Sequence, residues 1–235
     1  MSHQKAVVIN FSGNVGKSTI SKHLLAPRLD NAPIISVESI NAGGAGVATV
    51  RGEQFGEIQE NMMMLDSAVV DIGASNVEDF VELMKSYVGS HEEFDYFIVP
   101  TVPDQKQGND TIATIAALSE DIGIEKERIR VVFNRVDPRY SIEEQFKSLF
   151  AYYADQRTFT LRRDAVMHVN EIYSLAADAG QSIDEILSDP TDYRALIREA
   201  QTPEDKARLA RMVSIKRLAV GVKAELDSVF KALTK

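Results

Sequence analysis

Short apolar segments alternate with longer amphipathic segments along most of the chain. The apolar segments are continuous and rich in β-branched residues, and they lie at 6–11, 33–37, 67–72, 96–100 and 129–134, with a weaker one at 157–161. Continuous runs of about five apolar residues are typical of parallel strands covered by helices on both faces. Helical spacing between them predicts helices over 17–28, 52–65, 77–88, 108–121 and 142–153. The pattern therefore predicts an α/β fold, a mostly parallel twisted sheet flanked by helices on both faces.

The chain changes character from Ser182 onward, where no strand-like segment remains. Apolar residues there recur at spacings of three and four, which predicts one stripe of a long helix: Leu209, Met212, Ile215, Ala219, Val222, Leu226, Val229 and Leu233. Residues 202–205 supply a cap, a first-turn proline and two first-turn acids. We expect extra C-terminal helices whose stripe docks on the sheet or on a partner subunit. Without a clear linker, residues 1–235 are interpreted as one domain, with a core over 1–190 and a helical extension over 191–235.

A glycine-bearing loop follows the first apolar segment and opens a helix. Backbone N–H groups of such a loop, together with the helix N-terminus, point at bound phosphates. We assign this cradle to Gly13, Asn14, Val15, Gly16, Lys17, Ser18 and Thr19. Lys17 is expected to reach the β- and γ-phosphates, and the Ser18 hydroxyl to ligate Mg²⁺. The sequence departs from the full P-loop pattern at Phe11, where that pattern has a glycine.

Two acidic residues follow later strands of the predicted sheet. Asp71 ends an apolar strand and precedes Gly73 by two residues, so Asp71 is expected to hold Mg²⁺ and the Gly73 N–H to sense the γ-phosphate. A surface aspartate at a strand end is the plainer interpretation. Glu38 follows the second strand and is assigned a catalytic role, orienting the attacking water or helping to hold Mg²⁺. A helix or turn cap is the alternative for Glu38.

A third polar segment follows the fifth strand. Asn134, Arg135 and Asp137 have the spacing of the Asn-Lys-x-Asp guanine reader, with arginine in place of lysine. The Asp137 carboxylate is able to accept two hydrogen bonds from guanine that adenine does not offer. The alternative is that Asp137 and Pro138 form a turn. The segment leaves ATP and GTP both open.

The order of these motifs resembles the ParA/MinD group of deviant Walker ATPases. Residues 12–19 align with that group's loop, residues 131–138 resemble its base-binding strand and loop, and residues 161–166 and 179–183 resemble the next segment. The resemblance covers about residues 5–190. It implies a P-loop NTPase core that binds ATP or ADP and Mg²⁺, with the asparagine of the 131–138 segment on the adenine edge. Residues 10–18 and 37–41 resemble the StbB-like plasmid-stability branch of the group.

The resemblance implies a nucleotide-dependent switch in plasmid stability or partitioning, with an ATP-dependent homodimer and a DNA-bound partner protein. The sequence departs from the group at two places. Ser12 stands where the group has the lysine that reaches across the dimer, and Ser36 and Glu38 replace its aspartate pair. Slow hydrolysis is the consequence expected from the first departure. The alternatives are a nucleotide-binding adaptor with little hydrolysis, a phosphoryl-transfer enzyme like dethiobiotin synthetase, and a GTP-specific switch.

The amino-acid composition limits the classes of partner that we expect the protein to bind. With 26 basic and 35 acidic side chains the net charge is −9, which argues against indiscriminate binding of nucleic acid and leaves room only for a local basic patch. Candidate patches are the cluster Arg157, Arg162 and Arg163 and the scattered basic residues of the last helix. The absence of cysteine excludes disulfides and thiolate chemistry. No segment resembles an address or a membrane span, and we expect a cytoplasmic protein.

Overall fold

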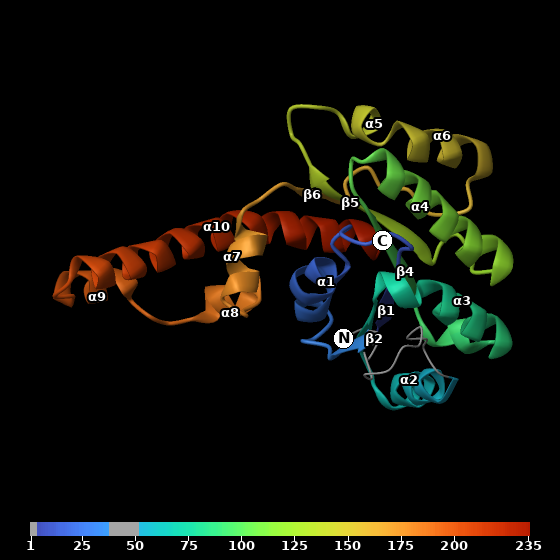
Figure 1. Ribbon diagram of the computed structural model, residues 1–235, viewed down its shortest axis with the longest axis horizontal. Helices are drawn as coiled ribbons and strands as arrows, with labels where there is room; N and C mark the ends of the chain where they lie inside the picture. The colour runs from blue at the N-terminus through green and yellow to red at the C-terminus, as the bar shows by residue number, and fades with distance from the viewer. Residues whose placement is uncertain (1–3, 38–51) are drawn as a thin grey trace, which may run out of the picture.

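The centre of the molecule is a parallel sheet with the first strand in its middle. The computed structural model describes residues 4–37 and 52–235, and Figure 1 shows their arrangement. The strands found there are β1 (Lys5–Val8), β2 (Ile34–Val37), β3 (Ala68–Ile72), β4 (Tyr96–Thr101), β5 (Ile129–Val136) and β6 (Val166–His168). Their spatial order is β2-β3-β1-β4-β5-β6, and every pairing among them is parallel. The predicted α/β class is confirmed.

Helices cover both faces of this sheet. Val7 and Val8 are neighbours in β1 and point to opposite faces, so each belongs to a different buried cluster. The Val7 cluster is completed by α2 (Gly52–Met64), α3 (Val77–Ser86), α4 (Gln105–Ala116) with its π-helical end η5 (Ala117–Asp121), α5 (Ile142–Gln145) and α6 (Lys147–Gln156). The Val8 cluster is completed by the helical segment 17–28 that follows β1, α7 (Ile172–Asp178), α8 (Ile183–Ser188) and α10 (Pro203–Leu233). The remaining elements are the 3-10 turns η3 (Ala74–Asn76) and η4 (Ser90–Glu93) and the helix α9 (Tyr193–Glu199).

The elements deviate from the sequence pattern in three places. The expected helix over 17–28 is present but irregular, since α1 (Lys17–Thr19) continues as a π-helix, η1 (Ile20–Leu25), and a 3-10 turn, η2 (Ala26–Arg28). The helix expected over 142–153 is divided at Phe146, whose φ of −122° interrupts it.

The third deviation concerns the sixth strand, for which the prediction over 157–161 was wrong. Thr160 makes only an isolated bridge to Arg130, and the strand itself lies at β6. Between the two, the chain leaves the sheet in a turn where the Ala165 N–H donates to the Arg162 carbonyl. The two arginines at 162 and 163 belong to this turn and separate the apolar residues on either side.

The last helix, α10, begins and packs as its sequence predicts. Thr202 caps it by accepting a hydrogen bond from the Asp205 N–H at 3.1 Å. Seven of the eight residues of the apolar stripe are buried and Met212 is partly buried, and residues from Ile215 onward share the cluster of Val8. The stripe therefore docks on the sheet of its own chain.

Two contacts on either side of α10 hold it in place. Arg28 of η2 pairs with Asp227 at 2.7 Å, and Nδ1 of His168 in β6 lies 2.5 Å from Oε2 of Glu225. Both acidic partners lie in the C-terminal half of α10. That half is therefore attached to the sheet by polar contacts as well as by burial.

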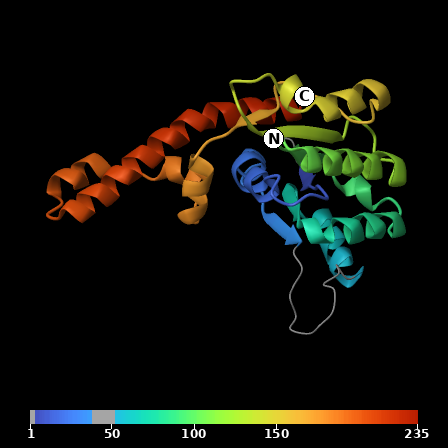
Figure 2. The same ribbon diagram turned by 45° about the horizontal axis from the view of Figure 1, so that its top comes forward.

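The first part of α10 extends beyond the sheet. The helix has 31 residues and is about 46 Å long at 1.5 Å per residue, which exceeds the width of the sheet it crosses. Figures 1 and 2 both show α9 folded back along this projecting part. We call residues 191–220 the arm; they contain α9, the projecting part of α10 and the first residues of α10 that reach the core cluster of Val8. In the part of the chain that the structure describes, no helix combines the length and apolarity needed to cross a membrane.

Candidate nucleotide-binding site

The loop between β1 and α1 is held in a conformation that requires glycine at Gly16. The φ of Gly16 is +91°, a region that L side chains rarely adopt. A Cβ there would also lie 2.2 Å from Nδ2 of Asn134. Gly13 is different, since a Cβ at that position would meet nothing closer than Ala74 at 4.0 Å. Protein packing explains Gly16, while the need for Gly13 as part of a phosphate cradle stays a prediction.

Lys17 lies in the centre of the loop. Its Nζ donates to the carbonyl oxygens of Asn10 at 3.0 Å and of Ser12 at 2.7 Å, and the side chain is buried. Burial lowers the pKa of Lys17 to about 8, against the opposing influence of the nearby Asp71 carboxylate. The loop thus holds a desolvated ammonium group, a point charge of the kind that binds phosphate in P-loops.

Asn10 braces the loop from below, a role that the sequence analysis missed. This fully buried side chain donates to the Pro100 carbonyl at 2.8 Å and to Thr111 Oγ1 at 2.9 Å, and its Oδ1 accepts from the Ser12 N–H at 2.7 Å. The amide therefore connects the loop to the end of β4 and to α4. The available signal was an asparagine directly after a run of apolar strand residues, because a polar side chain there must find buried partners.

The helix α4 supports the loop at a second point. The Phe11 N–H donates to Thr114 Oγ1 at 3.0 Å, one helical turn beyond Thr111. Phe11 occupies the position where the P-loop pattern has a glycine. Its backbone is fixed by the neighbouring helix, and its side chain packs against the core cluster of Val7.

The residues predicted to hold Mg²⁺ lie at one end of the sheet. Asp71 is the penultimate residue of β3 and lies in register with Val8, the last residue of β1, and its charge acts on Lys17. Ser18, the first residue after Lys17, is exposed. Across the described ranges no group of three or more acidic or histidine side chains forms a complete metal cage. Mg²⁺ commonly takes one or two protein ligands together with phosphate oxygens, so a hydroxyl and a carboxylate at this position fit that ion.

Other predicted cradle residues differ in accessibility. Val15 is fully buried, Asn14 is exposed with a φ of +59°, and Thr19 is partly buried. The Gly73 N–H donates to the Val37 carbonyl at 2.9 Å, so in this state it is used at the end of the sheet. Its predicted contact with a γ-phosphate would require that bond to break. Glu38 lies outside the described residues, and its proposed catalytic role stays a prediction.

Asn134 contacts the loop directly. Its buried side chain donates to the Val15 carbonyl at 2.9 Å and accepts from the Arg135 N–H at 2.9 Å. This is the same amide that a Cβ at Gly16 would strike. The contact with a base that the resemblance implies for Asn134 stays a prediction, whereas the structure shows it as a brace for the loop.

Asp137 is engaged in a turn. Its carboxylate accepts three hydrogen bonds from the Arg139 guanidinium, two from Nε and one from Nη2 at 2.6 Å, and a fourth from the Arg139 N–H at 3.0 Å. These contacts lower the pKa of Asp137 to about 2. The Tyr140 N–H donates to the Asp137 carbonyl at 3.2 Å and closes the turn. A guanine would have to displace Arg139, so the turn interpretation describes the observed state, and the exposed Arg135 does not pair with Asp137.

The basic cluster expected near the nucleotide is only partly free. Arg163 pairs with Glu143 at 2.5 Å and lies over the Phe150 ring. Arg157 is exposed and adopts a φ of +51° at the end of α6. Arg162 is partly buried, with its Nε lacking a hydrogen-bond partner in the described structure.

Known structures resemble this chain in fold, although neither a protein-family model nor a curated protein sequence matches it. Apo McdA from Cyanothece is 12% identical, with 98% of each chain covered and a TM-score of 0.56. A chain of the MinC:MinD cell division protein complex of Aquifex aeolicus is 12% identical, with 93% of this chain and 96% of that chain covered and a TM-score of 0.53. The chain has the fold of McdA and MinD.

A further MinD-type structure shares this fold. The cell division ATPase MinD of Pyrococcus furiosus is 12% identical, with 90% of this chain and 98% of that chain covered and a TM-score of 0.50. The three comparisons cover 90–98% of this chain. The resemblance to the ParA/MinD group is thereby confirmed at the level of the fold.

Proposed function

We propose that this chain is an ATP- and Mg²⁺-dependent switch of the ParA/MinD type. The observation that carries the proposal is the Lys17 ammonium, buried among loop carbonyls with the Asp71 carboxylate close enough to act on its pKa. The site lies at the carboxyl ends of parallel strands, where α/β sheets bind ligands. The fold shared with a MinD described as an ATPase supports the same conclusion.

The residues of the site have separate roles in this proposal. The loop N–H groups and Lys17 hold the phosphates, and Ser18 and Asp71 hold Mg²⁺, which neutralises phosphate charge when bound. Asn10 and Asn134 keep the loop in shape through their contacts with its backbone. ATP is favoured over GTP because the Asp137 carboxylate is already bonded to Arg139.

The site supports nucleotide binding better than it supports nucleotide hydrolysis. Ser12 is buried, its N–H is bonded to Asn10, and its short neutral side chain supplies no cation to a partner's nucleotide. A charge of that kind accelerates related phosphoryl transfers by several orders of magnitude. We therefore propose a slow ATPase, and the second candidate is a nucleotide-binding adaptor with almost no hydrolysis.

The wider role is also a proposal. We infer a cytoplasmic protein of positioning or partitioning, such as plasmid stability, in which nucleotide controls homodimer formation and a DNA-bound partner protein. The MinC:MinD complex among the similar structures shows that this fold assembles with a second protein. A direct DNA contact would be small and salt-sensitive, because the chain carries −9. Residues 1–235 are treated as one domain because α10 shares a buried cluster with β1.

Nucleotide titration tests the core of the proposal. Fluorescent ATP and GTP are titrated against the wild-type chain and Lys17→Ala with Mg²⁺ present, and phosphate release is followed in parallel. We expect tighter binding of ATP than of GTP, slow release, and at least a hundredfold weaker binding by Lys17→Ala. Lys22→Ala is the matched control, because Lys22 follows on the same helix but bonds the Gly180 carbonyl. Equal affinity of wild type and Lys17→Ala would remove the site, and rapid phosphate release by the wild type would remove the slow-turnover assignment.

A further inference from the structure

The projecting part of α10 has a second apolar face besides the stripe that packs on the sheet. Val213 and Val220 lie two turns apart on it. At 100° per residue this face is roughly 140° around the helix from Ile215 and Ala219, which are buried in the core. Val220 is 65% exposed, although the helix has ample polar residues for a solvated surface. Val213 is partly buried beside it, so the two valines present one apolar strip that is accessible from solvent.

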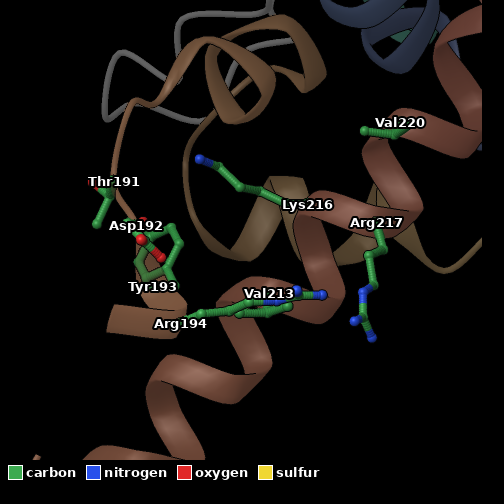
Figure 3. Close-up of a pocket in the computed structure, with 8 residues that line it drawn as sticks. All are labelled: Thr191, Asp192, Tyr193, Arg194, Val213, Lys216, Arg217 and Val220. Carbon is green, nitrogen blue, oxygen red and sulfur yellow. The ribbon is translucent and has the colours of Figure 1, made fainter. Parts of the chain in front are cut away.

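A preformed cavity lies along this face. It has a volume of 350 Å³ and is lined from one side by the start of α9 and from the other by α10, as Figure 3 shows. The Tyr193 ring forms one wall, with the Lys216 Nζ 5.2 Å from its centre. The Tyr193 hydroxyl donates to Asp189 at 2.5 Å, and Lys216 pairs with the same carboxylate at 3.6 Å. These contacts fix the wall before any partner arrives, which reduces the entropy lost on binding.

The rim of the cavity carries two arginines against one carboxylate, that of Asp192, which caps α9 by accepting from the Ala195 N–H at 3.0 Å. Arg194 and Arg217 are exposed, and neither has a carboxylate within 4.0 Å in residues 4–37 and 52–235. The arm has seven basic and four acidic side chains and so carries +3, whereas the rest of the chain carries −12 of the total of −9. Among the described elements, the arm thus carries net positive charge on an otherwise acidic molecule, and such charge steers negatively charged partners.

We propose that the groove between α9 and α10 binds an acidic amphipathic segment of a partner protein. An apolar side chain of that segment fills the cavity between Tyr193, Val213 and Val220, and its flanking carboxylates pair with Arg194 and Arg217. A peptide is favoured over DNA because phosphates would meet the charged rim but leave the apolar cavity unfilled. The inference does not rest on nucleotide binding, since the arm lies apart from the loop of Lys17 (Figure 1).

Selection from a random dodecapeptide display library tests the proposal on the full chain. Wild-type protein is the target, and the double variant Val220→Asp/Arg217→Glu is the counter-target. We expect enriched sequences to combine a large apolar residue with Asp or Glu on either side. As synthetic peptides in fluorescence anisotropy, they should bind at least tenfold more weakly to Val220→Asp and to Arg217→Glu than to wild type.

Matched controls separate this surface from general effects. Arg211→Glu makes the same charge change on the same helix but roughly 120° away from Arg217 at 100° per residue, and should leave peptide affinity within about twofold. Val169→Asp makes the same apolar-to-acid change at a residue that is 67% exposed in the loop after β6. Lys17→Ala should abolish nucleotide binding and leave peptide binding unchanged, so the two proposals fail independently.

Several outcomes overturn the proposal. Failure to enrich any sequence over the counter-target, or enrichment of sequences without carboxylates, excludes an acidic peptide. A 20-base-pair DNA duplex serves as the competing ligand. If it binds wild type, and if Arg217→Glu weakens this binding while Val220→Asp does not, the rim is assigned to DNA. Self-association in sedimentation velocity that disappears in Val220→Asp assigns the face to a second copy of the chain.

Discussion

The loop of residues 9–17 and the arm are built on opposite principles. Under the loop, the polar side chains of Asn10 and Asn134 are buried and bonded at 2.8–2.9 Å to backbone groups far away in sequence. On the arm, Arg194 and Arg217 are exposed and unpaired in the described structure, and Val220 faces solvent. Buried polar contacts fix one conformation, whereas exposed unpaired groups leave binding energy available for a partner. The comparison indicates that the loop is built to hold a shape and the arm to meet another molecule.

The largest effect is expected from Gly16→Ala, which breaks the loop side of the comparison. Alanine at this position must adopt a positive φ, and its Cβ would clash with the side chain of Asn134. We therefore expect the free energy of unfolding to fall by about 3 kcal/mol. Nucleotide binding should be lost. Urea denaturation and ATP titration measure both effects. Gly13→Ala is the control, because its Cβ has room; it should keep full stability, and equal destabilisation of the two variants would contradict this account.

A smaller effect is expected from Asn10→Ala. The change leaves the Ser12 N–H and the Pro100 carbonyl without their partner, which costs about 2 kcal/mol of unfolding free energy. The loop should also bind ATP more weakly, because its backbone is no longer fixed. Thr114→Val removes the acceptor of the Phe11 N–H together with the hydroxyl that donates to the Asp110 carbonyl, and should cost about 1 kcal/mol. If Asn10→Ala kept both its stability and its ATP affinity, the brace would have no function.

The sequence was sufficient to predict the elements that depend on neighbouring residues or on the regular spacing of apolar residues. The strand, loop and helix at residues 5–28 follow from local hydrophobicity and glycine placement. The stripe of α10 follows from spacing alone, and its burial confirms it. The sixth strand was misplaced because two short apolar segments flank Arg162 and Arg163, and only pairing with β5 decides between them.

The side-chain contacts that brace the loop could not be predicted from such local patterns. Asn10 and Thr111 are 101 residues apart, and Asn134 and Val15 are 119 residues apart. Nothing local distinguishes a bracing asparagine from a ligand-binding one, and Asn134 was accordingly assigned to a base. The groove of the arm was missed for a similar reason. The basic residues of the last helix scatter when they are plotted on one helix, and only the packing of α9 brings Arg194 beside Arg217.

A third prediction uses pH to separate the loop from the arm. Burial lowers the pKa of Lys17 to about 8 from its usual 10.5, so between these values the folded state gives up a proton that the unfolded state retains. The stability of wild type relative to Lys17→Met should therefore rise with pH across that window. ATP affinity should fall over the same window, by at most about tenfold per pH unit, because the charged form binds phosphate.

Peptide binding at the arm supplies the contrast in that experiment. The rim groups are arginines, and a guanidinium is not deprotonated in proteins. Peptide affinity should accordingly remain constant from pH 7 to 9.5 while ATP affinity declines. ATP affinity that is flat across the window would show that Lys17 does not titrate with the lowered pKa.

The smallest effect is expected on the outer face of the arm, where two neighbouring residues of α10 sharpen the comparison. Val220 is 65% exposed and Ala219 is fully buried, although they are consecutive. Val220→Asp should change the free energy of unfolding by no more than about 0.5 kcal/mol, as substitutions at exposed positions generally do. Ala219→Asp buries a carboxylate in the cluster of Val8 and should cost at least about 3 kcal/mol. Urea denaturation of both variants distinguishes a face kept for folding from a face kept for a partner. Comparable losses would mean that Val220 serves the fold, and the exposed face would then need no partner to explain it.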